Sequence, residues 1–444
     1  MNDLRKRQSE LEQMVGKLLD SAKQQGATSA EAVVSRDSGF GVSVRMGEVE
    51  TVERTQDNAL GVTVYFGQRK GTASTSDFSH EAIEETVKAA CNFARYTSED
   101  DCSGLADAEL MATDVPDLDL YHPWDIEVDD AIALALRCED AARAEDPRIT
   151  NSEGADVNSH SGLHVYGNSH GFVGGYPTSR HSLSCSVLGQ QGDSMERDYW
   201  YTSARCSDDL EAAEAVGKHA AERALARLGG RSLSTRQSPI IFHANIASSL
   251  LGSFLGAIRG SALYRQASFL LDHLGKPIFP EFVHIHEEPL LKCAAASAPF
   301  DNEGVATYAK DLITDGVLSS YLLSSYSARK LGMQTTANAG GIHNLRIDSG
   351  DLDHAALLKE MGSGLLVTEL MGQGSNPVTG DYSRGASGFW IENGEIQYPV
   401  HEITIAGNLK QMYQDLLAIS NDIDRRGSIQ TGSWLIREMT IAGE

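Results

Sequence analysis

Two histidine-rich stretches are the first candidates for metal chemistry in this sequence of 444 residues. The stretch VHIHEEP places His284 and His286 on one face of an expected strand, followed by Glu287 and Glu288. Imidazole and carboxylate groups are ligands that Zn²⁺ accepts, so the pair could share a metal ion. Without a third ligand at a defined spacing, the pattern favours a solvated strand end before Pro289. A second stretch, NSHSGLHVYGNSHG, holds three imidazoles that alternation and turn residues explain as strand and loop positions: His160, His164 and His170.

Two glycine-rich segments could bring the main chain close to a ligand. Residues 372–388 read GQGSNPVTGDYSRGASG and residues 339–344 read AGGIHN. Glycine has no side chain, so it allows another group to approach the backbone. The alternative for the first segment is a long glycine-rich hairpin connection. The candidate cleft residues of the two segments are Gly340, Gly341, His343, Asn344, Gly374, Asp381, Ser383 and Arg384.

Several catalytic signatures are absent from the sequence. GSGL and GASG do not form the GxSxG elbow that presents a nucleophilic serine. The phosphate-binding patterns GxxxxGK[ST] and GxGxxG do not occur, and neither do HExxH and HExxxH. No motif by itself therefore assigns an activity.

The spacing predicts an unusual helix over residues 248–265. Apolar residues recur at three- and four-residue intervals and form one buried face: Leu250, Leu251, Phe254, Leu255 and Ile258. Small residues recur every fourth position along the same helix: Ser248, Gly252, Gly256 and Gly260. Each glycine costs a helix about 1 kcal/mol relative to alanine. The stripe implies that something approaches the helix too closely for a side chain.

The composition is that of a globular protein with a strongly acidic balance. Hydrophobic residues make up 41% and charged residues 22%, while the formal net charge is -25 and the isoelectric point is near 4.9. Nucleic-acid binding depends on Lys and Arg that neutralise phosphates, and no basic stripe with interleaved aromatic residues is present. We therefore expect no direct nucleic-acid partner.

The cysteines and the N-terminus indicate the compartment. The six cysteines are scattered without a CxxC pair or zinc-ribbon spacing, as expected of reduced thiols in the cytosol. The opening MNDLRKRQSELEQ is a charged amphipathic helix, so no signal peptide is expected. No stretch of about 18 apolar residues is present to span a bilayer. The sequence predicts a cytoplasmic protein that does not bind membranes.

Residues 1–120 are predicted to form an α+β domain. An opening helix ends near Gly26, and Ser79 caps a second helix. Residues 96–126 are rich in Asp and show no sustained period, so they are expected to form a linker or crossover. Between the helices lie β-rich segments of an antiparallel meander, with turn signals at residues 37–39, 46–47 and 66–67.

Residues 121–231 repeat the order of helix, meander and helix, and are predicted to form a second α+β subdomain. Its last helix is expected to be capped by Ser207 and to stop at residues 229–230. The repeated order predicts a structural duplication, although the two units share no obvious sequence repeat.

Residues 232–444 are predicted to form a larger, mainly antiparallel β-rich domain that contains the glycine-striped helix. Asp315-Gly316 and Asn393-Gly394 are strong signals for hairpin turns. At about 150 residues per domain, the length agrees with three segments. The predicted fold class is α+β, with antiparallel β-meanders flanked by helices in the N-terminal part.

Five segments, read in order over nearly the whole chain, resemble the TldD/PmbA family and its PmbA branch, also called TldE. The resemblance implies a cytoplasmic zinc metallopeptidase system in which TldD and TldE chains pair as a heterodimer. The segments are ALGVTVY (59–65), APFDNEGV (298–305), SYSARKLG (325–332), AGGIHN (339–344) and ELMGQGSNPVTGDYSRGASGFWIENGEIQYPVHEITIAGN (369–408).

The resemblance also implies what this chain lacks. TldD-type chains carry an HExxxH helix, in which two histidines bind zinc and the glutamate activates water, and a late cysteine completes the ligand set. Aligned on Gly260-Ser261, the first histidine falls at Leu251, the glutamate at Gly252 and the second histidine at Gly256. The late cysteine falls at Thr431. We expect no zinc in this chain and zinc in a TldD-type partner.

The function that the resemblance implies is that of a metal-free subunit that closes the active-site chamber and positions extended peptides. Relatives are linked to maturation of a peptide antibiotic, to antitoxin degradation and, by name, to modulation of DNA gyrase. Two alternatives stay open. One is an autonomous peptidase with an unrecognised site, for example around His343 and Asp381. The other is a non-enzymatic homodimer that regulates gyrase.

Two explanations of the glycine stripe follow. If the helix borders a cleft that faces the zinc helix of the partner, Gly252, Gly256 and Gly260 leave room for a partner backbone or a threading peptide. If instead a strand of the same domain packs against the helix, the glycines serve close packing alone. Substitution of a larger side chain at Gly256 separates the two.

Overall fold

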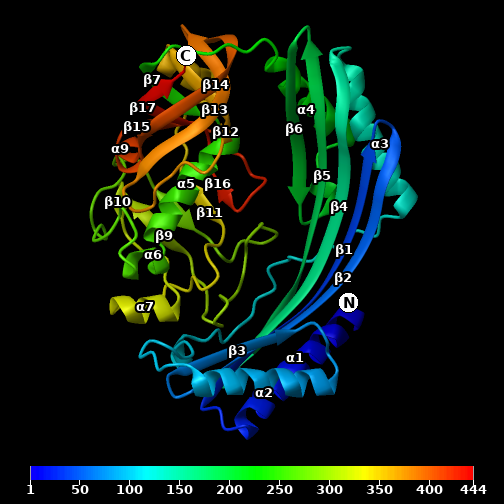
Figure 1. Ribbon diagram of the computed structural model, residues 1–444, viewed down its shortest axis with the longest axis vertical. Helices are drawn as coiled ribbons and strands as arrows, with labels where there is room; N and C mark the ends of the chain where they lie inside the picture. Colours follow the sequence, from blue (N-terminus) through cyan, green and yellow to red (C-terminus); the bar gives the residue numbers. More distant parts are fainter. Residues whose placement is uncertain (1, 444) are drawn as a thin grey trace.

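Residues 2–443 are described by a computed structural model, in which one long sheet arches around a separate C-terminal part (Figure 1). The sheet has the strand order β3-β2-β1-β4-β5-β6, and every pairing is antiparallel. Its centre is the pair β1–β4, so the expected units 1–120 and 121–231 share one sheet. The strands are β1 (Ser29–Arg45), β2 (Glu48–Phe66), β3 (Arg69–Thr75), β4 (Ile149–Asn168), β5 (Val173–Gln191) and β6 (Ser194–Ala204).

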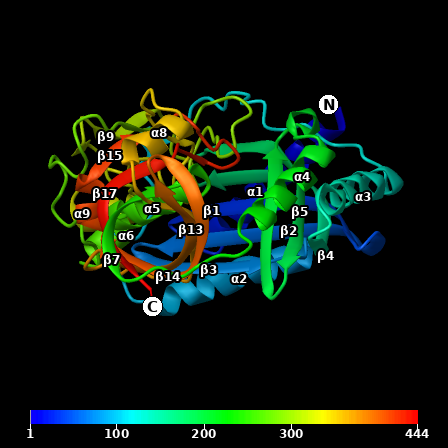
Figure 2. The same ribbon diagram turned by 90° about the horizontal axis from the view of Figure 1, so that it is seen from above.

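Four helices cover one face of this sheet in two pairs (Figure 2). Buried Val34 faces the first pair, and buried Val42 faces the second. Successive side chains of a strand alternate between faces, so these two even-numbered positions place both pairs on one side. Both units have the order helix, three strands, helix, as expected. The helices are α1 (Asn2–Gln24) and α2 (His80–Tyr96), then α3 (Val128–Glu145) and α4 (Ala213–Ala226).

Two local predictions in the sheet half are wrong. Residues 37–39 form no turn, because β1 runs through them and pairs there with both β2 and β4. Pairing on both sides satisfies the backbone groups that a turn would otherwise use. Ser207 does not cap α4. It begins a short 3₁₀ helix, η2 (Ser207–Asp209), and α4 starts at Ala213. Ser79 caps α2 as predicted, with its Oγ accepting a hydrogen bond from Ala82 N at 3.3 Å.

The linker between the two units is irregular apart from η1 (Ala108–Leu110), and it is tied to the C-terminal part. Arg329 donates hydrogen bonds to the carbonyl oxygens of Leu105 at 2.5 Å and Gly104 at 3.2 Å. Met111 forms an isolated antiparallel bridge with Val305. The linker therefore fixes the sheet against the C-terminal part.

The C-terminal part is built around a closed sheet. Its strand order is β14-β13-β12-β7-β17-β15, and an additional β14–β17 pairing closes a barrel. Most pairings are antiparallel, whereas β7–β12 is parallel. The strands are β7 (Arg236–Phe242), β12 (Gly364–Met371), β13 (Asp381–Glu392), β14 (Glu395–Asn408), β15 (Leu416–Ile419) and β17 (Trp434–Ala442).

A smaller sheet of order β10-β9-β8-β11-β16 packs beside the barrel, with β11–β16 parallel. Both predicted hairpin turns are confirmed: Asp315 and Gly316 have φ of 50° and 73°, and Asn393 and Gly394 have 53° and 76°. The strands are β8 (Ile285–Glu287), β9 (Lys310–Thr314), β10 (Val317–Leu318), β11 (Leu345–Ile347) and β16 (Ile429–Gln430). The helices of this part include α7 (Ser325–Leu331), α8 (His354–Met361) and α9 (Leu409–Gln414). Within residues 2–443, no helix combines the length and apolar character that a membrane crossing requires.

The glycine-striped helix is two helices, not one. α5 (Ala244–Ile258) ends at Arg259, which is extended with φ -70° and ψ 132°, and α6 (Gly260–Tyr264) follows. The break occurs because Leu322 takes over the backbone bonds: its N–H donates to Ile258 O at 3.1 Å, and its carbonyl accepts from Gly260 N at 2.8 Å. The apolar face of α5 is buried as predicted.

The break divides the glycine stripe into two environments. A Cβ added at Gly252 or Gly256 would meet no atom within 4 Å outside the helix's own backbone. A Cβ added at Gly260 would collide with the side chains of Ser327 and Leu323, the latter at 2.9 Å. Close packing within the chain therefore explains Gly260, while Gly252 and Gly256 face open space.

We expect Gly260→Ala and Gly256→Ala to change stability in opposite directions. The first substitution overfills a packed site and should lower the free energy of unfolding by about 1–3 kcal/mol. The second adds a helix-favouring residue in open space and should raise that free energy by about 0.5–1 kcal/mol. Urea unfolding of the two variants measures both changes. Equal destabilisation by both would contradict the open environment of Gly256.

Candidate functional site

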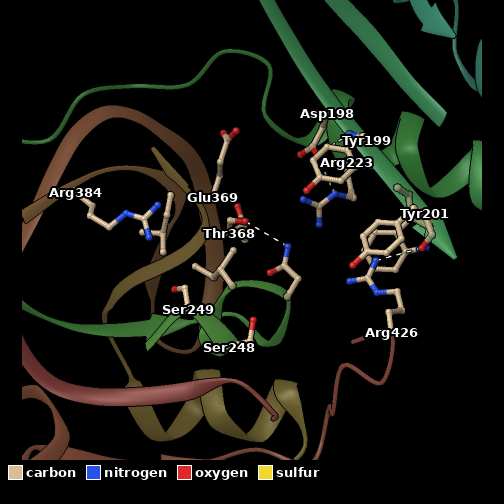
Figure 3. A pocket seen from close by; sticks show the side chains of 14 residues that line it. Asp198, Tyr199, Tyr201, Arg223, Ser248, Ser249, Thr368, Glu369, Arg384 and Arg426 are labelled. Carbon is tan, nitrogen blue, oxygen red and sulfur yellow. Dashed lines mark hydrogen bonds and ion pairs between the residues drawn. The ribbon is translucent and has the colours of Figure 1, made fainter. Parts of the chain in front are cut away.

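Two neighbouring cavities follow the open face of α5. The first, of about 290 Å³, lies between β6 and α4 on one side and α5 and β12 on the other (Figure 3). The second, of about 410 Å³, is lined by Gly252, Gly256 and the connection between β12 and β13. Ser249 and Arg384 line both, so we name the two together the α5 cleft.

The barrel fixes the start of α5 at the first cavity. Phe242, the last residue of β7, pairs with Val367 on one side and Trp434 on the other. His243 follows at once as the N-cap, and its Nδ1 accepts a hydrogen bond from Asn245 N at 3.3 Å. Because β7 is paired on both sides, it fixes the position of Asn245 and the following residues at the cleft.

Arginines dominate the electrostatics of the first cavity. Arg223 of α4 pairs with Asp198 at 3.1 Å. Arg426 pairs with Asp424 at 2.6 Å, and its guanidinium carbon lies 3.9 Å from the ring centroid of Trp200. Burial alone would raise the pKa of the Asp424 carboxyl, but the hydrogen bonds from Arg426 hold that pKa below its ordinary value. These side chains come from both halves of the molecule and join them at the cleft.

An ion pair crosses this junction directly. Arg227, just beyond the end of α4, reaches Glu369 of β12 at 2.6 Å and Glu196 of β6 at 3.2 Å. Both partners are at least two-thirds buried, so this contact is less screened by salt than a surface pair. Sequence reasoning singled out none of Arg223, Arg227 and Arg426, because the junction that they border joins segments far apart along the chain.

The candidate residues of the β12–β13 connection have different roles in the structure. The connection is a long glycine-rich hairpin, which was the alternative expectation, and Gly374 and Arg384 line the cleft within and beside it. Gly374 packs directly against the backbone of Ser383. Asp381 accepts hydrogen bonds from Thr379 Oγ1 at 2.7 Å and Asn408 Nδ2 at 3.3 Å, so it anchors the connection.

The candidates of residues 339–344 lie in a different network, centred on Glu287. This carboxylate is fully buried and contacts His343 Nδ1 at 2.8 Å, Asn338 Nδ2 at 2.8 Å and Lys310 Nζ at 2.9 Å. Burial alone would raise the pKa of Glu287, while His343 and Lys310 hold it below its ordinary value. Gly340 and Gly341 have positive φ next to this network. Asn344 Nδ2 donates to Ser297 Oγ at 2.7 Å and Glu288 O at 2.9 Å.

The histidine-rich stretches have local partners. His286 bridges Asp311 at 2.6 Å and Asp348 at 3.3 Å, and His284 lies 3.6 Å from Asp315. Burial alone would lower the pKa of His286, but these two carboxylates raise it above its ordinary value. In the second stretch each imidazole has different neighbours. His160 lies 3.4 Å from Asp37, and His170 Nε2 lies 3.1 Å from Ala106 O. His164 is partly buried, and loss of solvation lowers its pKa.

The positions that the resemblance aligns with a zinc site do not fit a metal. Leu251 is fully buried in the core, and Gly252 and Gly256 carry no donor atom. Thr431 is fully buried, and its Oγ1 accepts a hydrogen bond from Trp434 Nε1 at 2.7 Å. These four positions offer no set of nitrogen, sulfur or carboxylate ligands.

His243 lies in one of two groups of potential metal ligands among residues 2–443. His243, His354 and Asp422 bring one potential ligand atom each within 4.8 Å of one another, and Asp119, His122 and Cys293 do the same. Asp422 is already engaged, because it accepts from Ser433 N at 2.8 Å, Ser433 Oγ at 2.7 Å and His354 Nδ1 at 3.2 Å. The contacts tie the segment before β16 to α8, which sequence spacing could not reveal.

Comparison with known proteins identifies the family. Sequence models of the PmbA/TldA metallopeptidase match domain 1 at residues 30–94, the central domain at 121–228 and the C-terminal domain at 235–443. Metalloprotease PmbA of Escherichia coli O157:H7 is 54% identical over 434 residues, covering 98% of this chain and 96% of that protein. The chain belongs to the PmbA/TldD metallopeptidase family. The Metalloprotease PmbA homolog of Haemophilus influenzae is 53% identical over 99% of this chain and 98% of its own length.

Two crystal structures share the fold of this chain. BT3649 of Bacteroides thetaiotaomicron has a TM-score of 0.92 at 28% identity, covering 97% of this chain and 98% of that chain. TldE of Thermococcus kodakarensis has a TM-score of 0.81 at 20% identity, covering 97% and 100%, and supports the fold alone. The expected family membership and α+β fold class are thus confirmed.

We expect Glu287→Gln to lower the free energy of unfolding by about 3–5 kcal/mol, because it leaves the buried Lys310 ammonium without a counter-charge. The matched control is Glu288→Gln, whose half-exposed partner Arg346 lies 3.5 Å away, with an expected change of about 0–1 kcal/mol. Urea unfolding measures both.

The same network predicts a pH dependence. The pKa of Glu287 is lower in the folded chain than its ordinary 4.5, so its contribution to stability is complete above that value and is lost as the pH falls through the folded pKa. Glu287→Gln should abolish this part of the acid dependence. An unchanged acid profile in the variant would contradict the assignment.

Proposed function

We propose that this chain is the metal-free subunit of a cytoplasmic TldD–TldE zinc metallopeptidase that processes small or unfolded peptides. The observation that carries the proposal is the open face of α5, where Gly252 and Gly256 stand at positions that the resemblance aligns with a zinc-binding helix. The chain supplies room at these positions instead of ligands. Hydrolysis is then carried out by zinc on an HExxxH-bearing partner.

Two features of the α5 cleft support a role in peptide positioning. The cleft combines open main-chain space with side chains that can hydrogen-bond an extended peptide, among them Asn245, Ser249 and Thr368. An extended peptide exposes its main-chain N–H and C=O groups, and proteins often bind these groups by strand addition. In this proposal the substrates include peptide-antibiotic precursors and antitoxins, and any effect on DNA gyrase is indirect, through peptides.

The geometry gives no support to an autonomous site around His343 and Asp381. His343 is buried against Glu287, whereas Asp381 is bonded to Thr379 and Asn408. A general base must lie within hydrogen-bond distance of the proton that it removes, and both of these side chains are already bonded to groups of the chain itself. The non-enzymatic homodimer remains as an outcome of the test below.

Co-expression with a TldD-type chain tests the pairing. We expect a stable complex with equal amounts of both chains, stoichiometric zinc in the complex, and no zinc retained by this chain alone after dialysis. Gel filtration and metal analysis measure these three results. A stable homodimer that excludes the HExxxH chain, or stoichiometric zinc in the isolated chain, would contradict the proposal.

Gly256→Leu tests whether the open face of α5 is used. The side chain enters open space, so we expect the thermal unfolding of the chain to remain near that of the wild type, while peptide hydrolysis by the complex or pairing with the partner is lost. The matched control is Gly16→Leu, which places the same side chain in open space on α1. Full activity of the Gly256→Leu complex would show that the face is unused.

A further inference from the structure

The second cavity of the α5 cleft contains polar side chains that the rest of the chain leaves without partners. Ser249 Oγ, Tyr382 Oη and Arg384 Nε are each buried, and the contact between the Arg384 guanidinium and the Tyr382 hydroxyl is their only side-chain partnership within residues 2–443. All three residues line this cavity. Buried polar atoms are nearly always paired in folded proteins, so three polar groups around one cavity with no partner beyond one another indicate a ligand.

Tyr382 is the most enclosed of the three. Its side chain is only 2% exposed, and its ring packs edge-on against Phe242 with the centroids 6.4 Å apart. Burial raises the pKa of Tyr382 to about 12, although the charge of Arg384 and its hydrogen bond to the hydroxyl oxygen oppose the rise, so the hydroxyl keeps its proton at neutral pH. It is therefore available as a hydrogen-bond donor.

Arg384 is an arginine of the α5 cleft that has no carboxylate partner. Arg223, Arg227 and Arg426 each pair with one or more carboxylates. Arg384 forms no ion pair with any acidic side chain of residues 2–443, and Figure 3 shows its guanidinium pointing toward Ser249 and Thr368. A guanidinium presents a planar fork of donors that matches a carboxylate.

We propose that Arg384, Tyr382 and Ser249 bind one carboxylate of an extended peptide, its C-terminal carboxylate. A hydroxyl rotates to suit an acceptor, so the Tyr382 and Ser249 hydroxyls can turn toward the anion while Arg384 neutralises it. Gly252 and Gly256 leave space beside the site for the rest of the peptide chain. A net charge of -25 opposes anions of higher charge, which favours a single carboxylate over a polyphosphate.

This inference deepens the proposed function, on which its biological meaning rests, but it concerns residues of this chain alone. Binding is therefore measured on the isolated full-length chain, without a partner or zinc. The probe is a fluorescein-labelled alanine–serine peptide with a free C-terminus, compared by fluorescence anisotropy with the same peptide as its C-terminal amide. If the chain binds the free acid but never pairs with an HExxxH chain, the proposed function fails and the carboxylate site stands.

We expect the free acid to bind about tenfold to a hundredfold more tightly than the amide, the range for hydrogen bonds to a charged group. Arg384→Gln should remove this difference, and Tyr382→Phe, which keeps the ring, should reduce it. The matched control is Arg437→Gln on β17, a largely exposed arginine beside Asp415 that lines neither cavity, and it should bind like the wild type.

A third peptide distinguishes the source of the carboxylate. It is the amide with Glu as its last residue, and we expect it to bind no better than the plain amide. Tight binding of this peptide would move the ligand to an acidic side chain and overturn the C-terminal assignment. Equal binding of acid and amide to the wild type, or discrimination that survives in Arg384→Gln, would overturn the site itself.

Discussion

The burial of α5 on one side only is the constraint on which the rest of the structure depends. Leu250, Leu251 and Phe254 are fully buried, and burial of such side chains contributes about 1.5–3 kcal/mol each. Tyr413 Oη also donates to Leu250 O at 2.9 Å. These contacts fix the rotation of the helix about its axis. With 3.6 residues per turn, Gly252 and Gly256 must then face away from this core, toward the α5 cleft.

An ion pair and a cation–π contact hold the two walls of the cleft together. Arg227, after α4, pairs with Glu369 of β12, and the Arg426 guanidinium lies over the ring of Trp200 in β6. In a chain of net charge -25, arginines that lie close together usually form ion pairs with nearby carboxylates. Arg384 is the exception in the cleft, and this makes a local site for a negative charge compatible with an acidic protein.

Local sequence signals predicted the elements well where they agreed with the tertiary contacts. The Ser79 cap and the two hairpin turns are confirmed because one short segment contains everything that each needs. Residues 37–39 and Ser207 carry similar signals, yet pairing of β1 on both sides and an intervening 3₁₀ turn override them. The break at Arg259 depends on Leu322, which the helical periodicity of residues 248–265 could not include.

The sequence by itself determined the family, the α+β class, the buried face of α5 and the absence of an HExxxH pattern. Each of these depends on the types of residues that lie close together along the chain. Only the tertiary structure decided which candidate residues meet. It brought Ser249 of α5 to Tyr382 and Arg384 of β13, placed His343 in the buried network of Glu287, and gave Gly260 a packing role that Gly252 and Gly256 do not share. The physical reason is that these contacts join segments far apart along the chain, whose distances are set by the packing of whole elements.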